Sequence, residues 1–248
     1  IGGDNNSGLM ISGFMNVTGN MASGLHFSGI ANITGQSFGG LMASGLLNVV
    51  GEHMNGLQIA GIANITASKL NGVQVALCNY ATKARGLQIG LVNYYKEDMK
   101  GFQLGLVNAN PDTKVQMMIY GGNATPANIG VRFKNQLFYT ILGVGSMYQG
   151  LNDKFSASAS YRAGLSFPLY KGLSISGDLG YQHIEAFDNK DEVIPKRLYA
   201  LQARANLEYQ FTKKFGIFAT GGYGLTRFYN KSSNYDKGAI IEAGIVLF

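Results

Sequence analysis

The chain has 248 residues, of which 14% are charged, and its formal net charge is +6. Soluble domains average roughly 25% charged residues, so this composition disfavours a cytosolic enzyme. No run approaches the ~18 consecutive apolar residues of a membrane helix, so any membrane crossing must use strands. No basic cluster of the kind that follows a phosphate backbone is present, and nucleic-acid binding is therefore not expected.

Residues 7–109 form an internal repeat whose spacing is 16 residues at first and then 14 to 16. The first four units are SGLMISGFMNVTG (7–19), SGLHFSGIANITG (23–35), GGLMASGLLNVVG (39–51) and NGLQIAGIANITA (55–67). Three shorter units follow, NGVQVALCNY (71–80), RGLQIGLVNY (85–94) and KGFQLGLVNA (100–109). Each unit begins near a glycine (Gly8, Gly24, Gly40, Gly56, Gly72, Gly86 and Gly101) and contains an asparagine (Asn16, Asn32, Asn48, Asn64, Asn79, Asn93 and Asn108).

A fixed short period of this kind decides the fold of the region. In a parallel β-solenoid every unit is one coil, so equivalent residues stack and the asparagines form a ladder of side-chain amides. The leading glycines would then mark corners that need a positive φ or a close approach. In an antiparallel meander the period should span two strands, so the single-strand period favours the solenoid. The alternative is that the units are membrane strands of one larger barrel.

Charge is almost absent from the first part of the repeat. Residues 1–68 contain two formal charges, Asp4 and Glu52. A solvated solenoid usually carries more, so this surface is expected to be covered by a partner or by a membrane, unless the units are themselves membrane strands.

The units GLQIAGIANIT, GLQIGLVNYY and GFQLGLVNAN resemble the glycine-rich repeat of a bacterial surface-repeat family found on outer-membrane proteins. The resemblance covers about residues 7–109 through the recurring pattern G-Φ-Q-Φ-G-Φ-x-N. The first three units depart from it, with Met10, His26 and Met42 where later units have glutamine. The resemblance implies a β-rich repeat at the cell envelope and no chemistry.

The second half alternates apolar and polar residues through eight runs. The runs are Val115–Asn123, Asn128–Lys134, Leu137–Tyr148, Phe155–Leu169, Leu173–Glu185, Leu198–Phe211, Phe215–Tyr229 and Gly238–Phe248. The connections after the second, fourth and sixth runs are tight, whereas those after the fifth and seventh are long and charged. Outer-membrane barrels have an even number of strands, short periplasmic turns and longer extracellular loops. We therefore predict an all-β chain with a repeat region at 1–114, for which a parallel β-solenoid is favoured, followed by an eight-stranded antiparallel transmembrane β-barrel at 115–248.

The alternation of residues in these runs predicts a barrel with an apolar outer surface and a polar interior. In Leu198–Phe211, aromatic and aliphatic residues alternate with polar ones at the period of a strand. An eight-stranded barrel has an interior just filled by side chains, so this half should be an anchor rather than a pore. Buried charges need partners, and Arg162 with Asp178 on the next strand is the predicted pair. The predicted inward charges are Arg132, Arg162, Asp178, Arg204 and Glu208, with Arg227 and Glu242 as further candidates.

The chain ends on the apolar run AGIVLF. Resemblance to bacterial outer-membrane proteins implies that Phe248 is part of the signal read by their insertion machinery. Barrels of this kind need an export signal, and none is visible, so a chain that begins at Ile1 is expected to be a processed or partial product.

Residue types that support catalysis or metal binding are sparse. The three histidines, His26, His53 and His183, lack metal-ligand spacing, and no cofactor is expected. His183 lies near Glu185 and is interpreted as a polar group at a loop end rather than a catalytic base. Cys78 is interpreted as a packing residue. Asp188, Asp191 and Glu192 have the chemistry of a calcium site, but a solvated loop tip is the favoured interpretation.

These patterns predict a non-enzymatic protein of the bacterial outer membrane. The barrel would sit in outer-membrane lipid, and the repeat would present a surface to other envelope proteins in a larger complex. The alternative is a porin or transporter in which the repeats add strands to a barrel of about fifteen or sixteen strands with an aqueous lumen. A weaker third hypothesis, a lipid-modifying surface enzyme, would require a site at the membrane rim around His183.

Overall fold

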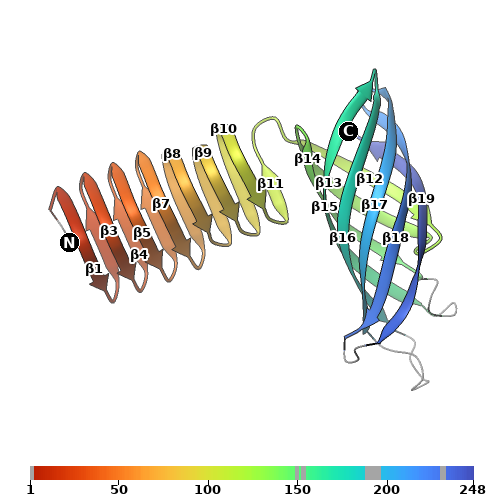
Figure 1. Cartoon of the computed structure of the whole chain (residues 1–248), viewed down its shortest axis with the longest axis horizontal. Helices are drawn as coiled ribbons and strands as arrows, with labels where there is room; N and C mark the ends of the chain where they lie inside the picture. The colour runs from red at the N-terminus through yellow and green to blue at the C-terminus, as the bar shows by residue number, and fades with distance from the viewer. Residues whose placement is uncertain (1–2, 149–150, 152–154, 188–196, 230–232) are drawn as a thin grey trace. The chain divides into compact units, whose positions relative to one another are not determined.

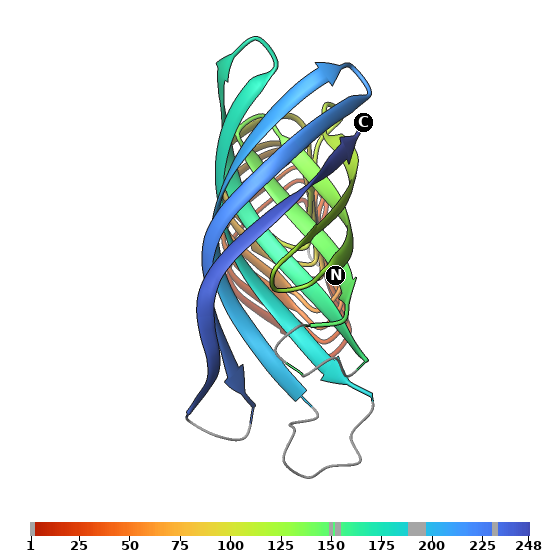
Figure 2. The same cartoon turned by 90° about the vertical axis from the view of Figure 1, so that its right-hand side faces the viewer.

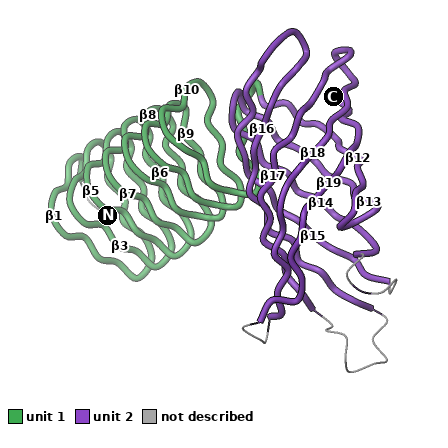
Figure 3. Tube along the Cα trace, turned by 45° about the vertical axis from the view of Figure 1, so that its right-hand side comes forward, with its two compact units in different colours: residues 1–112 green, residues 113–248 purple. Residues whose placement is uncertain are grey.

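The computed structural model describes residues 3–148, 151, 155–187, 197–229 and 233–248. The chain divides into two compact units, residues 1–112 and 113–248, drawn in different colours in Figure 3. The sequence predicts this boundary two residues later. The regular elements of the described residues are all β-strands, and none of the described residues forms a helix long and apolar enough to cross a membrane.

The first unit is a parallel β-solenoid. Each early coil has one strand of eight residues and one of four, which Figure 1 shows as a stack running from β1 to β11. From the fourth coil on, the short strand runs directly into the next long strand. The strands are β1 (Asn5–Ser12), β2 (Met15–Thr18), β3 (Met21–Ser28), β4 (Ala31–Thr34), β5 (Ser37–Ser44), β6 (Leu47–Val50), β7 (His53–Ala60), β8 (Ala63–Val75), β9 (Cys78–Ile89), β10 (Val92–Leu104) and β11 (Val107–Ala109).

Equivalent residues of successive coils pair in register. Gly8 lies opposite Gly24 between β1 and β3, and Asn16 lies opposite Asn32 between β2 and β4. The solenoid strands pair only with one another, in a sheet separate from the closed ladder of the second unit. The alternative in which the repeats add strands to a larger barrel is therefore wrong, and the parallel solenoid is confirmed.

The leading glycines do not lie at corners. They lie inside the long strands, where their φ angles run from 97° at Gly8 to 144° at Gly101. A Cβ atom on Gly24 would approach the carbonyl carbon of Gly8 to 2.9 Å, so the stacking leaves no room for a side chain. Only glycine satisfies both the left-handed φ and the close approach. The prediction of a positive φ is right, and the predicted location at a corner is wrong.

The interior of the solenoid has an apolar side and a polar side. Buried apolar side chains, including Phe38, Met54 and Leu70, stack along the first half of the long strands. Asparagine, glutamine and threonine side chains are buried on the other side. Buried polar groups are stable only when they are hydrogen-bonded, so the polar side requires a continuous network.

The second unit is a closed antiparallel barrel whose strands follow chain order from β12 to β19, with β19 pairing back onto β12. Figure 2 shows its tilted strands. The strands are β12 (Lys114–Gly122), β13 (Ala127–Asn135), β14 (Phe138–Ser146), β15 (Ser156–Tyr170), β16 (Leu173–Ala186), β17 (Arg197–Thr212), β18 (Phe215–Phe228) and β19 (Asn234–Leu247). The predicted eight-stranded barrel is confirmed.

The last strand begins earlier than predicted. The sequence predicts a start at Gly238, whereas β19 begins at Asn234 and its Asp236 pairs with Thr226 of β18. Asp236 and Lys237, which the sequence predicts to lie in a loop, therefore belong to the first part of β19, at the end of the barrel that has the long connections. Tight connections follow β13, β15 and β17, and these define the short-turn end of the barrel.

Candidate functional site

The seven predicted asparagines form one ladder inside the solenoid. Each side-chain amide donates to the Oδ1 atom of the next asparagine, at 2.9 Å from Asn16 to Asn32 and at 3.1 Å from Asn64 to Asn79. The same donor also reaches backbone carbonyl oxygens; Asn48, for example, donates to Ile59 at 2.7 Å. The remaining steps of the ladder join Asn32 to Asn48, Asn48 to Asn64, Asn79 to Asn93 and Asn93 to Asn108.

A second ladder, of glutamines, is not among the predicted site residues. Gln74 donates to Gln58 at 2.9 Å, Gln88 to Gln74 at 2.8 Å and Gln103 to Gln88 at 2.8 Å. Its signal was present in the sequence as the recurring G-Φ-Q. Together the two ladders link the coils through side chains as well as through the backbone.

His26 occupies the position in the second coil that glutamine occupies in the later coils, and its ring does not make the side-chain hydrogen bonds that link those glutamines. Its ring is buried, packs edge-on against Phe38 with the ring centroids 4.9 Å apart, and its Nε2 atom has no hydrogen-bond partner among the described residues. Burial lowers the pKa of His26 below its usual 6.5 because the charged form loses its hydration.

We therefore expect the solenoid to lose stability in acid. The unfolded chain binds a proton at His26 more readily than the folded chain, so stability is complete above the unfolded pKa and falls as pH drops below it. His26→Met, which matches Met10 and Met42 in the adjacent coils, should weaken this dependence. Urea unfolding at several pH values between about pH 8 and pH 5 gives the slope of the free energy of unfolding against pH, for the unmodified protein and for His26→Met. An unchanged slope in the variant would show that His26 does not contribute.

The barrel interior contains paired charges. Near the short-turn end, Arg132 forms two hydrogen bonds with Glu208, of 2.6 and 2.9 Å, and its Nε atom donates to Gln116 at 2.6 Å. Lys134 donates to Ser166 at 2.8 Å. These contacts join β12, β13, β15 and β17 across the lumen.

The middle of the lumen is occupied by the predicted pair of Arg162 and Asp178. Two hydrogen bonds of 2.8 Å join them, and both side chains are buried. Tyr139 and Asn206 each donate to the same carboxylate at 2.8 Å. Arg162 also lies 3.7 Å from Glu242, which extends the network across the lumen.

Arg204 completes this layer through Glu242, with hydrogen bonds of 3.1 and 3.2 Å. All five predicted inward charges are thus buried, and so is the further candidate Glu242. Arg227 is not inside. Thr226 and Phe228 take the inward positions on either side of it, and the half-buried Arg227 side chain donates to Asn234.

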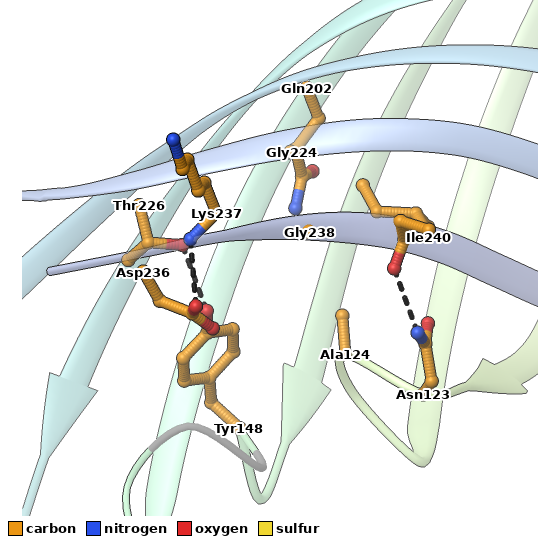
Figure 4. A pocket seen from close by; sticks show the side chains of 11 residues that line it. Asn123, Ala124, Tyr148, Gln202, Gly224, Thr226, Asp236, Lys237, Gly238 and Ile240 are labelled. Atoms are coloured by element: carbon orange, nitrogen blue, oxygen red, sulfur yellow. Dashed lines mark hydrogen bonds between the residues drawn. The ribbon is translucent and has the colours of Figure 1, made fainter. Parts of the chain in front are cut away.

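Apolar side chains are also buried at the long-loop end of the barrel. Tyr148 and Leu151, from the connection between β14 and β15, are buried against Ile184 and Leu198. The Tyr148 hydroxyl lies 2.8 Å from that of Thr226. Beside this plug is a hollow of about 460 Å³, shown in Figure 4, which Asp236, Lys237 and Gln202 help to line. No pattern in the sequence predicts a plug at this point.

The remaining candidate residues are His183, Cys78 and three acidic residues of a long connection. His183 Nδ1 lies 2.7 Å from the Tyr229 hydroxyl, and Nε2 lies 3.4 Å from Glu185, which also pairs with Arg197. Cys78 is exposed, so its interpretation as a packing residue is wrong. Asp188, Asp191 and Glu192 lie outside the described residues. Within the described residues, no group of three or more histidine, cysteine or acidic side chains is arranged to hold a metal ion.

The chain matches no protein-family profile and no curated protein, so its resemblance to a surface-repeat family stays a prediction. Among solved structures it is similar to one described as the crystal structure of Neisserial surface protein A (NspA), with 9% sequence identity and a TM-score of 0.34. The similarity covers 54% of this chain and 93% of that chain.

Proposed function

We propose that this protein is a non-enzymatic component of the bacterial outer membrane, in which the barrel is the lipid anchor and the solenoid presents a surface to other envelope proteins. The observation that carries the proposal is the outer face of the barrel. Large apolar side chains point outward there, among them Leu179 at 72% exposure and Leu207 at 51%. Exposure of this apolar face to water would be unfavourable, whereas the acyl chains of lipids would cover it.

Aromatic side chains border this apolar band at both ends. Tyr181, Tyr199 and Tyr229 contact one another near the long-loop end. Phe211 contacts Tyr209 and Phe215 near the short-turn end. Tyr199 and Tyr209 lie on the same strand, ten positions apart, which corresponds to about 33 Å along the strand, or about 25 Å along the barrel axis after a strand tilt of about 40°. That is the height of the apolar band in outer-membrane barrels.

The filled lumen argues against a channel. The Arg132–Glu208 pair, the network around Arg162 and the plug around Leu151 occupy successive levels of the barrel. Moving a solute through would require separating buried charge pairs, each at a cost of several kcal/mol. We therefore expect no conductance when the purified protein is added to a planar bilayer.

The solenoid is the part of the chain that suits binding. Its two amide ladders make it rigid, and its charges are concentrated in the later coils, at residues such as Lys83, Arg85 and Lys100. A rigid surface loses little conformational freedom when a partner docks. Envelope proteins are the proposed partners, in a larger complex, and no nucleic acid is expected to bind.

Phe248 is proposed as part of the signal recognised by the insertion machinery. Its backbone N–H donates to Lys214 at 3.1 Å, and its ring packs against the cluster that contains Met118 and Val246. A catalytic role is not proposed. His183 lies 2.7 Å from the Tyr229 hydroxyl and 3.4 Å from Glu185, and we assign these contacts to the aromatic border of the barrel.

The anchor is tested by placing a charge on the outer face. Leu179 pairs with Ala203, midway between the two aromatic borders, so Leu179→Arg should reduce the free energy of unfolding in lipid vesicles by about 2–4 kcal/mol. Phe187→Arg, beyond the long-loop border, should cost only about 0–1 kcal/mol. Equal costs at the two positions, measured by urea unfolding of the vesicle-bound protein, would contradict a transmembrane barrel.

A further inference from the structure

Charge is confined to one side of every solenoid coil. The nine charged residues of the repeats (Asp4, Glu52, Lys69, Lys83, Arg85, Lys96, Glu97, Asp98 and Lys100) all fall in the stretch that leads up to a leading glycine. The stretches after each glycine contain no Asp, Glu, Lys or Arg; they are residues 9–18, 25–34, 41–50, 57–66, 73–82, 87–95 and 102–109. Since the coils stack in register, this separation extends along the whole solenoid.

The uncharged side presents large apolar side chains outward. The corner after each long strand carries one in every coil, namely Phe14, Ile30, Leu46, Ile62, Leu77, Leu91 and Leu106. Their exposure runs from 37% at Leu106 to 74% at Phe14. A neighbouring column adds Ile11, Ile59, Ile89 and Leu104, and a third adds Leu9, Leu25 and Phe102, all exposed. We call these three columns the apolar face.

An apolar surface of this size is expected to contact another molecule. With strands about 4.8 Å apart, seven coils make it about 30 Å long. Soluble proteins rarely expose contiguous apolar patches larger than a few hundred Å², and larger ones mark interaction sites. The apolar face also carries no hydrogen-bonding side chain in its three columns, so it offers no group that would select one protein partner and fix its register.

The covalent connection favours a lipid cover. β11 ends at Ala109 and β12 begins at Lys114, so four residues, spanning at most about 14 Å, join the solenoid to the barrel. Lys114 pairs with Lys134, beside the tight connection that follows β13, so the chain enters the barrel at its short-turn end. The next residue, Val115, is 57% exposed on the outside of the barrel. With the barrel in a membrane, this short connection would keep the last coil of the solenoid within reach of the leaflet at that end.

Aromatic residues border the apolar face as they border the barrel. Tyr80 and Tyr94 lie on the short-strand side of adjacent coils, with their rings stacked and the centroids 5.8 Å apart. Tyrosine is enriched where apolar and polar zones of a membrane meet, because its ring is apolar and its hydroxyl is polar. A surface with this border and no charge matches an interfacial segment that lies in the plane of the leaflet.

We infer that the apolar face of the solenoid lies on the phospholipid leaflet at the short-turn end of the barrel, leaving the charged side of the coils in water. This inference rests on the proposed membrane anchor and assigns the two sides of the solenoid to different contacts. The charged side is then the part available to envelope proteins, and the membrane fixes the direction in which it points.

The chain contains no tryptophan, so single tryptophans report their own surroundings. The test uses the full-length chain in two sets of phosphatidylcholine vesicles, with acyl chains brominated close to the headgroup in one set, for the solenoid positions, and near the chain ends in the other, for the barrel. Ile62→Trp probes the apolar face, and His53→Trp probes the opposite, exposed side of the same coil. Leu179→Trp is the control for the barrel. We expect Ile62→Trp to lose roughly half or more of its emission relative to unbrominated vesicles, since docked surfaces bury about 5–10 Å deep.

Each outcome separates the two proposals. Quenching at Ile62→Trp and Leu179→Trp, but not at His53→Trp, supports the inference. Quenching at Leu179→Trp alone leaves the anchor intact and overturns the lipid contact, as would be found if another protein or a second copy covered the face. Equal quenching at Ile62→Trp and His53→Trp overturns a contact made by one side. No quenching at any position contradicts the anchor itself.

A second measurement avoids substitution. The single cysteine, Cys78, is exposed and directly follows Leu77 of the apolar face. A polarity-sensitive dye attached to Cys78 should shift its emission to the blue when the labelled protein moves from detergent-free nanodiscs of minimal lipid area to large vesicles. An emission that depends on protein concentration and not on lipid area would overturn the inference.

Discussion

Arg162→Ala should reduce the free energy of unfolding of the barrel by about 3–5 kcal/mol, because it leaves the Asp178 carboxylate buried without its cation. The two side chains share two hydrogen bonds of 2.8 Å at the centre of the lumen. Tyr139 and Asn206 would still donate to Asp178, but neutral donors do not balance its charge. Urea unfolding in detergent micelles, followed by circular dichroism and by heat-dependent gel migration, measures the loss.

Two further variants make that result specific. Arg162→Met combined with Asp178→Leu should recover much of the loss, since replacing a whole buried pair with apolar side chains is often neutral. Arg197→Ala removes an exposed partner of Glu185 and should cost at most about 1 kcal/mol. If Arg162→Ala cost no more than Arg197→Ala, the lumen would have to be hydrated rather than packed.

Asn64→Leu should have an effect of similar size in the solenoid. It removes the acceptor for Asn48 and the donor to Asn79, and it also deprives the Val75 carbonyl oxygen of its hydrogen bond of 3.0 Å. Each buried polar group left without a partner costs about 1–3 kcal/mol, so we expect a total of about 3–5 kcal/mol. Hydrogen exchange of the backbone amides should show the loss in the adjacent coils first, because each coil contacts only its neighbours.

The matched control is Asn71→Ala. Asn71 also donates to an asparagine of the preceding coil, Asn55, at 2.8 Å, but this pair is exposed. Water replaces a lost exposed hydrogen bond, so this variant should change stability by less than about 0.5 kcal/mol. Similar losses in Asn64→Leu and Asn71→Ala would mean that the internal ladder does not hold the coils together.

The features that were predictable from the sequence are those that follow from periodicity. Alternation with period two fixed the eight barrel runs, because a strand must turn every second side chain to the same face. One asparagine per unit favoured a stack, because parallel coils give every unit the same surroundings, although each early coil contains two strands and not the single strand that the period predicted. The pair of Arg162 and Asp178 followed from their positions on neighbouring strands facing the same side.

Other features depend on distances that periodicity does not contain. Arg132 and Glu208 meet across the lumen from β13 and β17, which depends on how the barrel closes. The burial of Leu151 depends on a connection folding back into the barrel mouth. The glutamine ladder was overlooked because only four coils carry it, and the leading glycines were misplaced because a positive φ occurs inside a strand as well as at a corner.

The most direct test of the central claim, that lipid covers the outer face of β12–β19, is flotation of the refolded chain with phospholipid vesicles after a wash with urea at high pH. The outward positions of Leu179, Leu207 and Tyr209 predict that the protein rises with the vesicles and aggregates when detergent and lipid are both withdrawn. A monodisperse protein in detergent-free buffer that stays behind when the vesicles float would contradict the account.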